Sequence, residues 1–198
     1  MATPTAIERR ILTVPNLITV MRLACIPVFW WLLLAKDDRA AAAWLLGALG
    51  ATDWVDGWVA RRFNQVSDLG KVLDPTADRI LFLTCLIAII IDGGVPTWLC
   101  VVVIVREALV GGAMVVATAM GMQRFDVQWV GKAGTFGLMW AFPLLLMGSA
   151  GDAFRHDLAT FLGWVCAVPG LFFSFYAAVT YIPLMRQALA EGRKARQL

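Results

Sequence analysis

Long apolar runs separated by short polar stretches dominate the pattern of the chain. Six runs each approach the ~20 residues with which a helix crosses a ~30 Å hydrocarbon core. They cover about residues 16–35, 40–62, 70–91, 96–120, 130–147 and 158–184. Polar residues at 36–39 and 92–94 separate neighbouring runs, and Pro169-Gly170 predicts a bend in the last helix. The pattern predicts an all-α integral membrane protein with six transmembrane helices.

The composition agrees with this prediction. Of the 198 residues, 60% are hydrophobic and 16% are charged. Soluble domains contain roughly 45–50% hydrophobic and about 25% charged residues. A soluble domain of this length could not bury so much apolar surface, and a disordered chain would show the opposite imbalance. The net charge of +3 is not clustered, which argues against a nucleic-acid partner.

The Lys and Arg residues between the runs predict the orientation in the membrane. Eleven lie on one side: Arg9, Arg10, Arg61, Arg62, Lys71, Arg124, Lys132, Arg186, Arg193, Lys194 and Arg196. Three lie on the other: Lys36, Arg39 and Arg155. The positive-inside rule then puts both termini in the cytoplasm, in a multi-pass protein of a bacterial-type inner membrane. Residues 5–12 predict a short interfacial helix rather than a signal sequence, and no linker divides residues 1–198 into domains.

Eight ionisable residues lie within the predicted spans, where each costs ~2.5–3.5 kcal/mol on insertion scales. They are Asp53, Asp56, Asp74, Asp78, Glu107, Arg22, Arg79 and Arg106. Asp53 follows Arg39 by 14 residues, and Asp78 precedes Asp92 by 14 residues, which is ~21 Å of helix in both cases. Two helices therefore bring a carboxylate to the same depth, ~9 Å below the cytoplasmic face. Miscounted helix ends would not produce this agreement.

The spacing of the four aspartates predicts a metal site. Asp53 and Asp56 stand at i and i+3, and Asp74 and Asp78 at i and i+4, so each pair shares one helix face. Clustered carboxylates need counter-charge, which two Mg²⁺ or Mn²⁺ ions would supply. Oxygen-only ligands favour such hard cations over zinc. Pro75 fits either a kink at the metal site or an ordinary helix start.

At these positions the sequence resembles the CDP-alcohol phosphatidyltransferase family. The family signature is D-x2-D-G-x2-A-R-x8-G-x3-D-x3-D, and every fixed position is met, by Asp53, Asp56, Gly57, Ala60, Arg61, Gly70, Asp74 and Asp78. The resemblance implies that the four aspartates bind two divalent cations and that Asp78 is also the catalytic base. It further implies a CDP-binding pocket formed by Asp56, Gly57, Ala60, Arg61 and Gly70. A homodimer is implied as well.

The same resemblance implies the substrates. CDP-diacylglycerol would donate its phosphatidyl group to a glycerol-type alcohol and release CMP, within a membrane of lipids that hold its acyl tails. Candidate acceptor-binding residues are Arg22, Arg106 and Lys132, although Arg106 could instead form an internal ion pair with Glu107.

The acceptor itself is predicted from one position. The segment GKAGT has Gly134 where glycerophosphate users of the family commonly have a second Lys. With one cation fewer, the sequence favours phosphatidylglycerol over glycerol-3-phosphate as the acceptor. The chain would then be a cardiolipin synthase rather than a phosphatidylglycerophosphate synthase. The alternative is that Gly134 only packs closely between helices.

A transport protein is the rival hypothesis from another class. Intramembrane aspartates also build cation or proton pathways, so a small carrier could contain them. The complete motif and the lack of inverted-repeat symmetry in the spans favour the enzyme.

Overall fold

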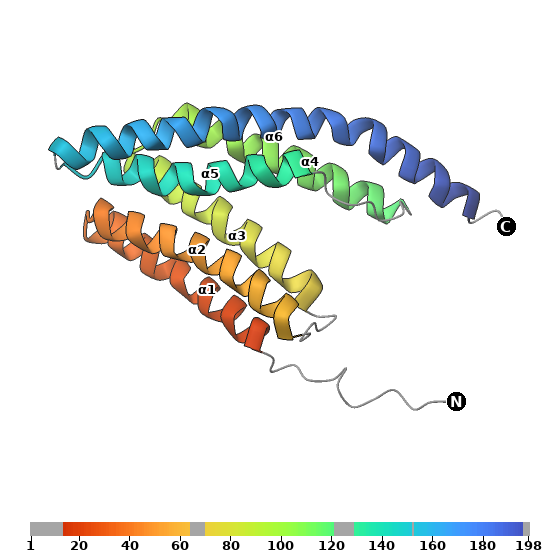
Figure 1. The fold of residues 1–198 in the computed structure, drawn as a ribbon, viewed down its shortest axis with the longest axis horizontal. Helices are drawn as coiled ribbons and strands as arrows, with labels where there is room; N and C mark the ends of the chain where they lie inside the picture. The colour runs from red at the N-terminus through yellow and green to blue at the C-terminus, as the bar shows by residue number, and fades with distance from the viewer. Residues whose placement is uncertain (1–13, 64–69, 121–128, 152, 196–198) are drawn as a thin grey trace. The chain divides into compact units, whose positions relative to one another are not determined.

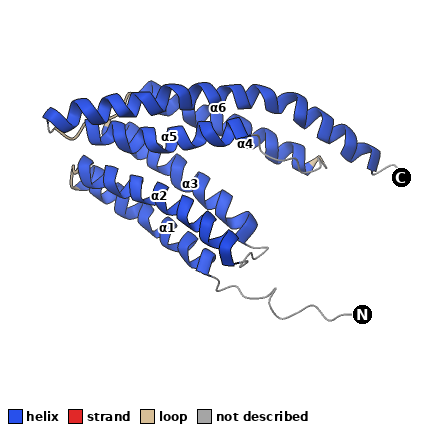
Figure 2. Ribbon diagram, in the orientation of Figure 1, coloured by secondary structure: helices blue, strands red, loops and turns tan. Residues whose placement is uncertain are grey.

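Every element of the computed structural model is a helix within the residues that it describes (Figures 1 and 2). These are residues 14–63, 70–120, 129–151 and 153–195, with side chains described at 20–52, 77–120, 129–151 and 156–189. The elements are α1 (Val14–Trp30), the π-helical turn η2 (Trp31–Ala35), α2 (Arg39–Phe63), α3 (Gly70–Asp92), α4 (Thr97–Ala119), α5 (Trp129–Gly148) and α6 (Ala153–Ala195). The predicted all-α class is confirmed, whereas the predicted interfacial helix at 5–12 lies outside the described residues.

Helix boundaries follow the apolar runs closely, with one exception. The helix α6 extends beyond the predicted residues 158–184 at both ends, to Ala153 and Ala195, and contains Pro169 and Pro183. Figure 1 shows it as a gently curved rod. The helix continues without interruption through both prolines. Within the described residues, three helices are long and apolar enough to cross a membrane: Thr97–Ala119, Trp129–Gly148 and His156–Leu189. The chain therefore has the character of a membrane-embedded protein.

Residues 1–94 form one compact unit, in which α1 contacts both α2 and α3. Its core contains Phe29, Leu33, Leu46, Leu86 and Ile89, all buried. These side chains come from α1, η2, α2 and α3, so apolar burial joins the four elements.

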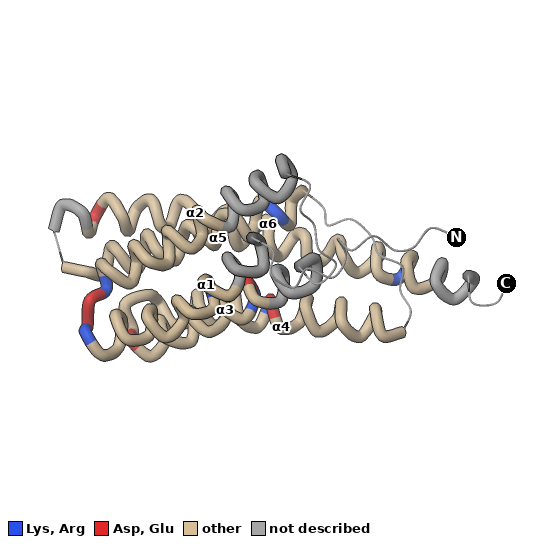
Figure 3. Tube along the Cα trace, turned by 90° about the horizontal axis from the view of Figure 1, so that it is seen from below, with Lys and Arg blue, Asp and Glu red and all other residues tan. Residues whose placement is uncertain are grey.

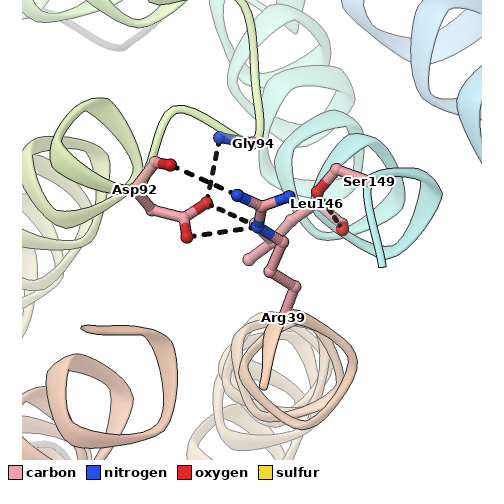
Figure 4. A network of polar contacts seen from close by, with 5 residues as sticks. All are labelled: Arg39, Asp92, Gly94, Leu146 and Ser149. Carbon is pink, nitrogen blue, oxygen red and sulfur yellow. Dashed lines mark hydrogen bonds and ion pairs between the residues drawn. The ribbon is translucent and has the colours of Figure 1, made fainter. Parts of the chain in front are cut away.

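An ion pair joins the first residue of α2 to the last residue of α3 (Figure 4). Arg39 donates from Nε to Asp92 Oδ2 at 3.0 Å and from Nη2 to the Asp92 carbonyl oxygen at 3.3 Å. The Asp92 side chain is only 3% exposed and also accepts from the Gly94 amide at 2.9 Å. This contact fixes the two helix ends at one level.

Residues 95–198 form the second unit, in which α5 packs along α6 and α4 also contacts α6. Glycines permit close approach of the helices: a Cβ atom on Gly134 would lie 2.6 Å from Ser174 N, and one on Gly170 would lie 2.9 Å from Leu138 N. Membrane helices associate through such small residues because lipid supplies no hydrophobic drive. Figure 3 shows that long stretches of the helices carry no charged residue, which sets apart the few charged positions within them.

Candidate active site

The sequence motif lies on two helices of the first unit. The last part of α2 contains Asp53, Asp56, Gly57, Ala60 and Arg61, and the first part of α3 contains Gly70, Asp74 and Asp78. The helical backbone supports the predicted spacing, in which each pair of aspartates shares a helix face. Of these eight residues, only Asp78 lies in the part with described side chains. The helix α3 begins at Gly70 and continues through Pro75, so Pro75 does not begin it.

The Arg39–Asp92 pair relates the heights of the two aspartate pairs. Asp53 lies 14 residues along α2 from Arg39, and Asp78 lies 14 residues along α3 from Asp92. At ~1.5 Å per residue, both backbones are ~21 Å from the paired ends. Arg39 and Asp92, from which the two depths were counted, are thus in direct contact. This supports one common level for the backbones of Asp53 and Asp78.

Asp78 forms an ion pair with Arg22 of α1. Arg22 Nη1 donates to Asp78 Oδ1, and the side chains are 7% and 36% exposed. A buried guanidinium needs such a partner because an uncompensated charge in a low-dielectric environment is expensive. The predicted base is therefore held by a residue that the sequence placed among the acceptor-binding candidates. Arg79, the next residue of α3, is exposed.

A second buried arginine, Arg106, lies in the other unit, on α4. Arg106 pairs with Glu107 through Nη1 and Oε1, and its Nη2 donates to the carbonyl oxygen of Ser174 at 3.0 Å. Among the described residues, Arg106 Nε and Ser174 Oγ are buried without a hydrogen-bond partner. The internal ion pair predicted as the alternative role of Arg106 is thus present, and two polar atoms beside it can still bind a ligand. Sequence reasoning missed Ser174, whose only signal is a polar residue within an aromatic run.

The α5–α6 contact corrects the interpretation of Gly134. Lys132, two residues earlier on α5, is exposed, whereas Gly134 is buried against the backbone of Ser174 and Gly170. No side chain fits at residue 134 without moving α6, because the atoms that it would meet belong to the backbone. The glycine is explained by packing, and the inference of a missing phosphate-binding cation loses its basis.

Replacing Gly134 by alanine should destabilise the protein by about 1–3 kcal/mol, the typical cost of overpacking. Gly112→Ala on α4 is the matched control, since a Cβ there would have no heavy atom within 4 Å. Thermal unfolding of the purified variants in detergent measures both. Equal unfolding temperatures for the two variants would show that α5 and α6 do not depend on this close contact.

Comparisons with known proteins agree with the motif. Residues 12–180 match the family described as CDP-alcohol phosphatidyltransferase. A Streptomyces coelicolor protein named cardiolipin synthase (CMP-forming) is 38% identical over 183 residues, covering 90% of this chain and 85% of its own. A Mycobacterium tuberculosis protein with cardiolipin synthase as its provisional name is 35% identical over 193 residues, covering 98% and 92%.

A third relative is named for a different activity. The Bacillus subtilis CDP-diacylglycerol–glycerol-3-phosphate 3-phosphatidyltransferase is 35% identical over 147 residues, covering 67% of this chain and 76% of its own. All three names describe enzymes of phospholipid synthesis, and the match at residues 12–180 includes the whole motif. The chain therefore belongs to the CDP-alcohol phosphatidyltransferase family and is a phosphatidyltransferase.

Proposed function

We propose that the chain transfers the phosphatidyl group of CDP-diacylglycerol to phosphatidylglycerol, which forms cardiolipin and releases CMP. The observation that carries the proposal is the complete eight-residue motif on α2 and α3 of a chain 38% identical to a CMP-forming cardiolipin synthase. A membrane-embedded site suits this chemistry because the donor has two acyl tails and a water-soluble nucleotide.

Two divalent cations, Mg²⁺ or Mn²⁺, belong to the proposal. Asp53, Asp56, Asp74 and Asp78 would hold them, since four carboxylates offer the oxygen ligands that hard cations prefer. The ion pair of Asp78 with Arg22 supports this assignment, because it demonstrates that a carboxylate here takes a cationic partner. When bound, the cations would neutralise the diphosphate and the charge that develops on the departing CMP.

The residues of the motif would divide the remaining work. Asp78 accepts the proton of the attacking acceptor hydroxyl, which makes that oxygen a better nucleophile. Arg61, near the end of α2, donates to a phosphate of the nucleotide, while Gly57, Ala60 and Gly70 leave room for CDP beside Asp56. The hydroxyl attacks the phosphorus that bears the diacylglycerol, and CMP leaves, so no covalent enzyme intermediate is needed.

The acceptor would be bound by cationic side chains. Arg22, Arg106 and Lys132 are the candidates, and the unpartnered Arg106 Nε and Ser174 Oγ support a polar ligand on α4 and α6. The name of the Streptomyces relative, cardiolipin synthase, supports phosphatidylglycerol as the acceptor of this chain. The name of the Bacillus relative supports glycerol-3-phosphate as the second candidate. A phosphatidylglycerophosphate synthase would use the same donor and the same phosphatidyl-transfer chemistry.

Competition between the two acceptors tests the assignment. Purified protein receives CDP-diacylglycerol, Mn²⁺ and equal concentrations of phosphatidylglycerol and glycerol-3-phosphate, and the lipid products are separated by chromatography. We expect cardiolipin as the main product. Phosphatidylglycerophosphate alone would overturn the acceptor assignment and leave the phosphatidyl-transfer reaction standing.

The proposed arrangement is a homodimer with six spans per chain, both termini in the cytoplasm and the active site facing the cytoplasm. The orientation is supported by the excess of Lys and Arg in the segments assigned to the cytoplasmic side, eleven against three. The homodimer is implied by the family resemblance alone. Cysteines introduced at residues 5 and 195 should resist a membrane-impermeant thiol reagent applied to intact cells. Labelling of either from outside would contradict the orientation.

A further inference from the structure

A buried polar cluster lies where α4 contacts α6 in the second unit. Arg106 of α4 pairs with Glu107 and donates from Nη2 to the carbonyl oxygen of Ser174 on α6, at 3.0 Å. Arg106 is 7% exposed and Ser174 is 1% exposed. Within the described part of the chain, Arg106 Nε and Ser174 Oγ are buried and have no hydrogen-bond partner. Buried polar atoms normally have one, so these two atoms indicate a ligand.

The charges of this cluster favour a ligand group without charge. The Arg106 guanidinium is already paired with the Glu107 carboxylate, so the two side chains together are neutral. A phosphate group at this point would leave an uncompensated negative charge beside a carboxylate, which is expensive in buried surroundings. A hydroxyl group adds no charge. Its oxygen accepts from Arg106 Nε while its hydrogen is donated to Ser174 Oγ, so both atoms gain a partner.

The depth of the cluster in its unit also favours a neutral group. A Cβ atom on Gly148, the last residue of α5, would lie 3.0 Å from Thr160 N, so these two residues mark one level. Ser174 follows Thr160 by 14 residues, which is ~21 Å of helix. Ser174 also packs against Gly134, which lies five residues, or ~8 Å, from the first residue of α5. The cluster is therefore inside a candidate membrane span, where a charged ligand group is costly.

We propose that Arg106 Nε and Ser174 Oγ bind the hydroxyl group of the acceptor's glycerol that does not react. The inference rests on the proposed function, in which a glycerol-type alcohol attacks CDP-diacylglycerol. Phosphatidylglycerol and glycerol-3-phosphate both have two hydroxyl groups on neighbouring carbon atoms, and only one of the two is the nucleophile. The other is a neutral donor and acceptor of the kind that the cluster lacks. Ser174 is then a specificity-determining residue that selects a 1,2-diol.

Acceptor analogues without the second hydroxyl group test this proposal. Phosphatidyl-1,3-propanediol is compared with phosphatidylglycerol in detergent mixed micelles, and 3-hydroxypropyl phosphate is compared with glycerol-3-phosphate, so that lipid and soluble acceptors are distinguished. CMP release from CDP-diacylglycerol with Mn²⁺ gives kcat/KM for each acceptor. Ser174→Ala removes the hydroxyl group with little change of volume. Thr118→Val on α4 is the control, because the Thr118 hydroxyl already donates to the Met114 carbonyl oxygen.

We expect the wild type and Thr118→Val to prefer phosphatidylglycerol over its analogue about 100-fold in kcat/KM, because hydrogen bonds that involve a charged group contribute about one to two decades. Ser174→Ala should lower kcat/KM for phosphatidylglycerol about 10-fold and leave that for the analogue unchanged. If glycerol-3-phosphate is the acceptor, the same ratios should hold for the soluble pair. Equal losses for an acceptor and its analogue would overturn the proposal, because Ser174 would then act only through packing.

The wild type alone provides a second test if Ser174→Ala does not fold. Equal kcat/KM for an acceptor and its analogue would show that the protein does not bind the second hydroxyl group, which would also overturn the proposal. Failure of the proposed function looks different, because none of the four acceptors would then support CMP release.

Discussion

Asp78→Asn should lose turnover by about 10²–10⁴-fold while it still binds CDP-diacylglycerol. Asparagine keeps an oxygen that can contact a cation, but its amide cannot accept the proton of the acceptor hydroxyl. Initial rates of CMP release at saturating Mn²⁺ measure the loss, and equilibrium binding of labelled CDP-diacylglycerol measures what is retained. Asp74→Ala should lose metal and nucleotide binding together, because it removes a ligand rather than the base.

The structure adds a necessary control to this experiment. Asp78→Asn also replaces the carboxylate that pairs with the buried Arg22 by a neutral amide, so some loss of stability is expected in addition to the loss of turnover. Asp92→Asn breaks the comparable pair with Arg39 at the other end of the same helix, outside the motif. It should lower the unfolding temperature and leave turnover close to that of the wild type. Full activity of the Asp78→Asn variant at saturating metal would exclude Asp78 as the base.

Much of the helical architecture could be predicted because hydropathy and helix length are linked in a membrane. Predicted spans at 96–120 and 130–147 correspond to α4 (Thr97–Ala119) and α5 (Trp129–Gly148). The end of α6 could not be found in this way. Beyond residue 184 the chain is polar but rich in Arg, Gln, Ala and Glu, which favour helices in water as well. Hydropathy marks the apolar run, and the helix continues past it.

Contacts between helices were beyond the sequence pattern. Helical periodicity tells which residues share a face of one helix, but Arg22 and Asp78 are 56 residues apart and lie on different helices. Their opposite charges in apolar surroundings were a usable signal, since buried charges are normally paired. Sequence alone allowed two roles for Gly134 and favoured a missing cation. Only the distance to the Ser174 backbone showed that the position is explained by packing.

Removal of divalent metal should stop the reaction, and this is the second large effect that we expect. Without counter-charge, the four aspartates would repel the diphosphate of CDP-diacylglycerol, so chelation should reduce CMP release more than about 100-fold. Added Mg²⁺ or Mn²⁺ should restore the rate, provided that the acceptor lipid is present. The matched control is the same protein with metal but without acceptor, which should release little CMP.

The most direct measurement of the central claim is therefore CMP release from CDP-diacylglycerol by purified protein, with and without divalent metal and phosphatidylglycerol. The account predicts CMP release only when both are present, in a 1:1 ratio with newly formed cardiolipin. Cation or proton flux through the protein in sealed vesicles, with no CMP release under any of these conditions, would contradict it and favour a carrier.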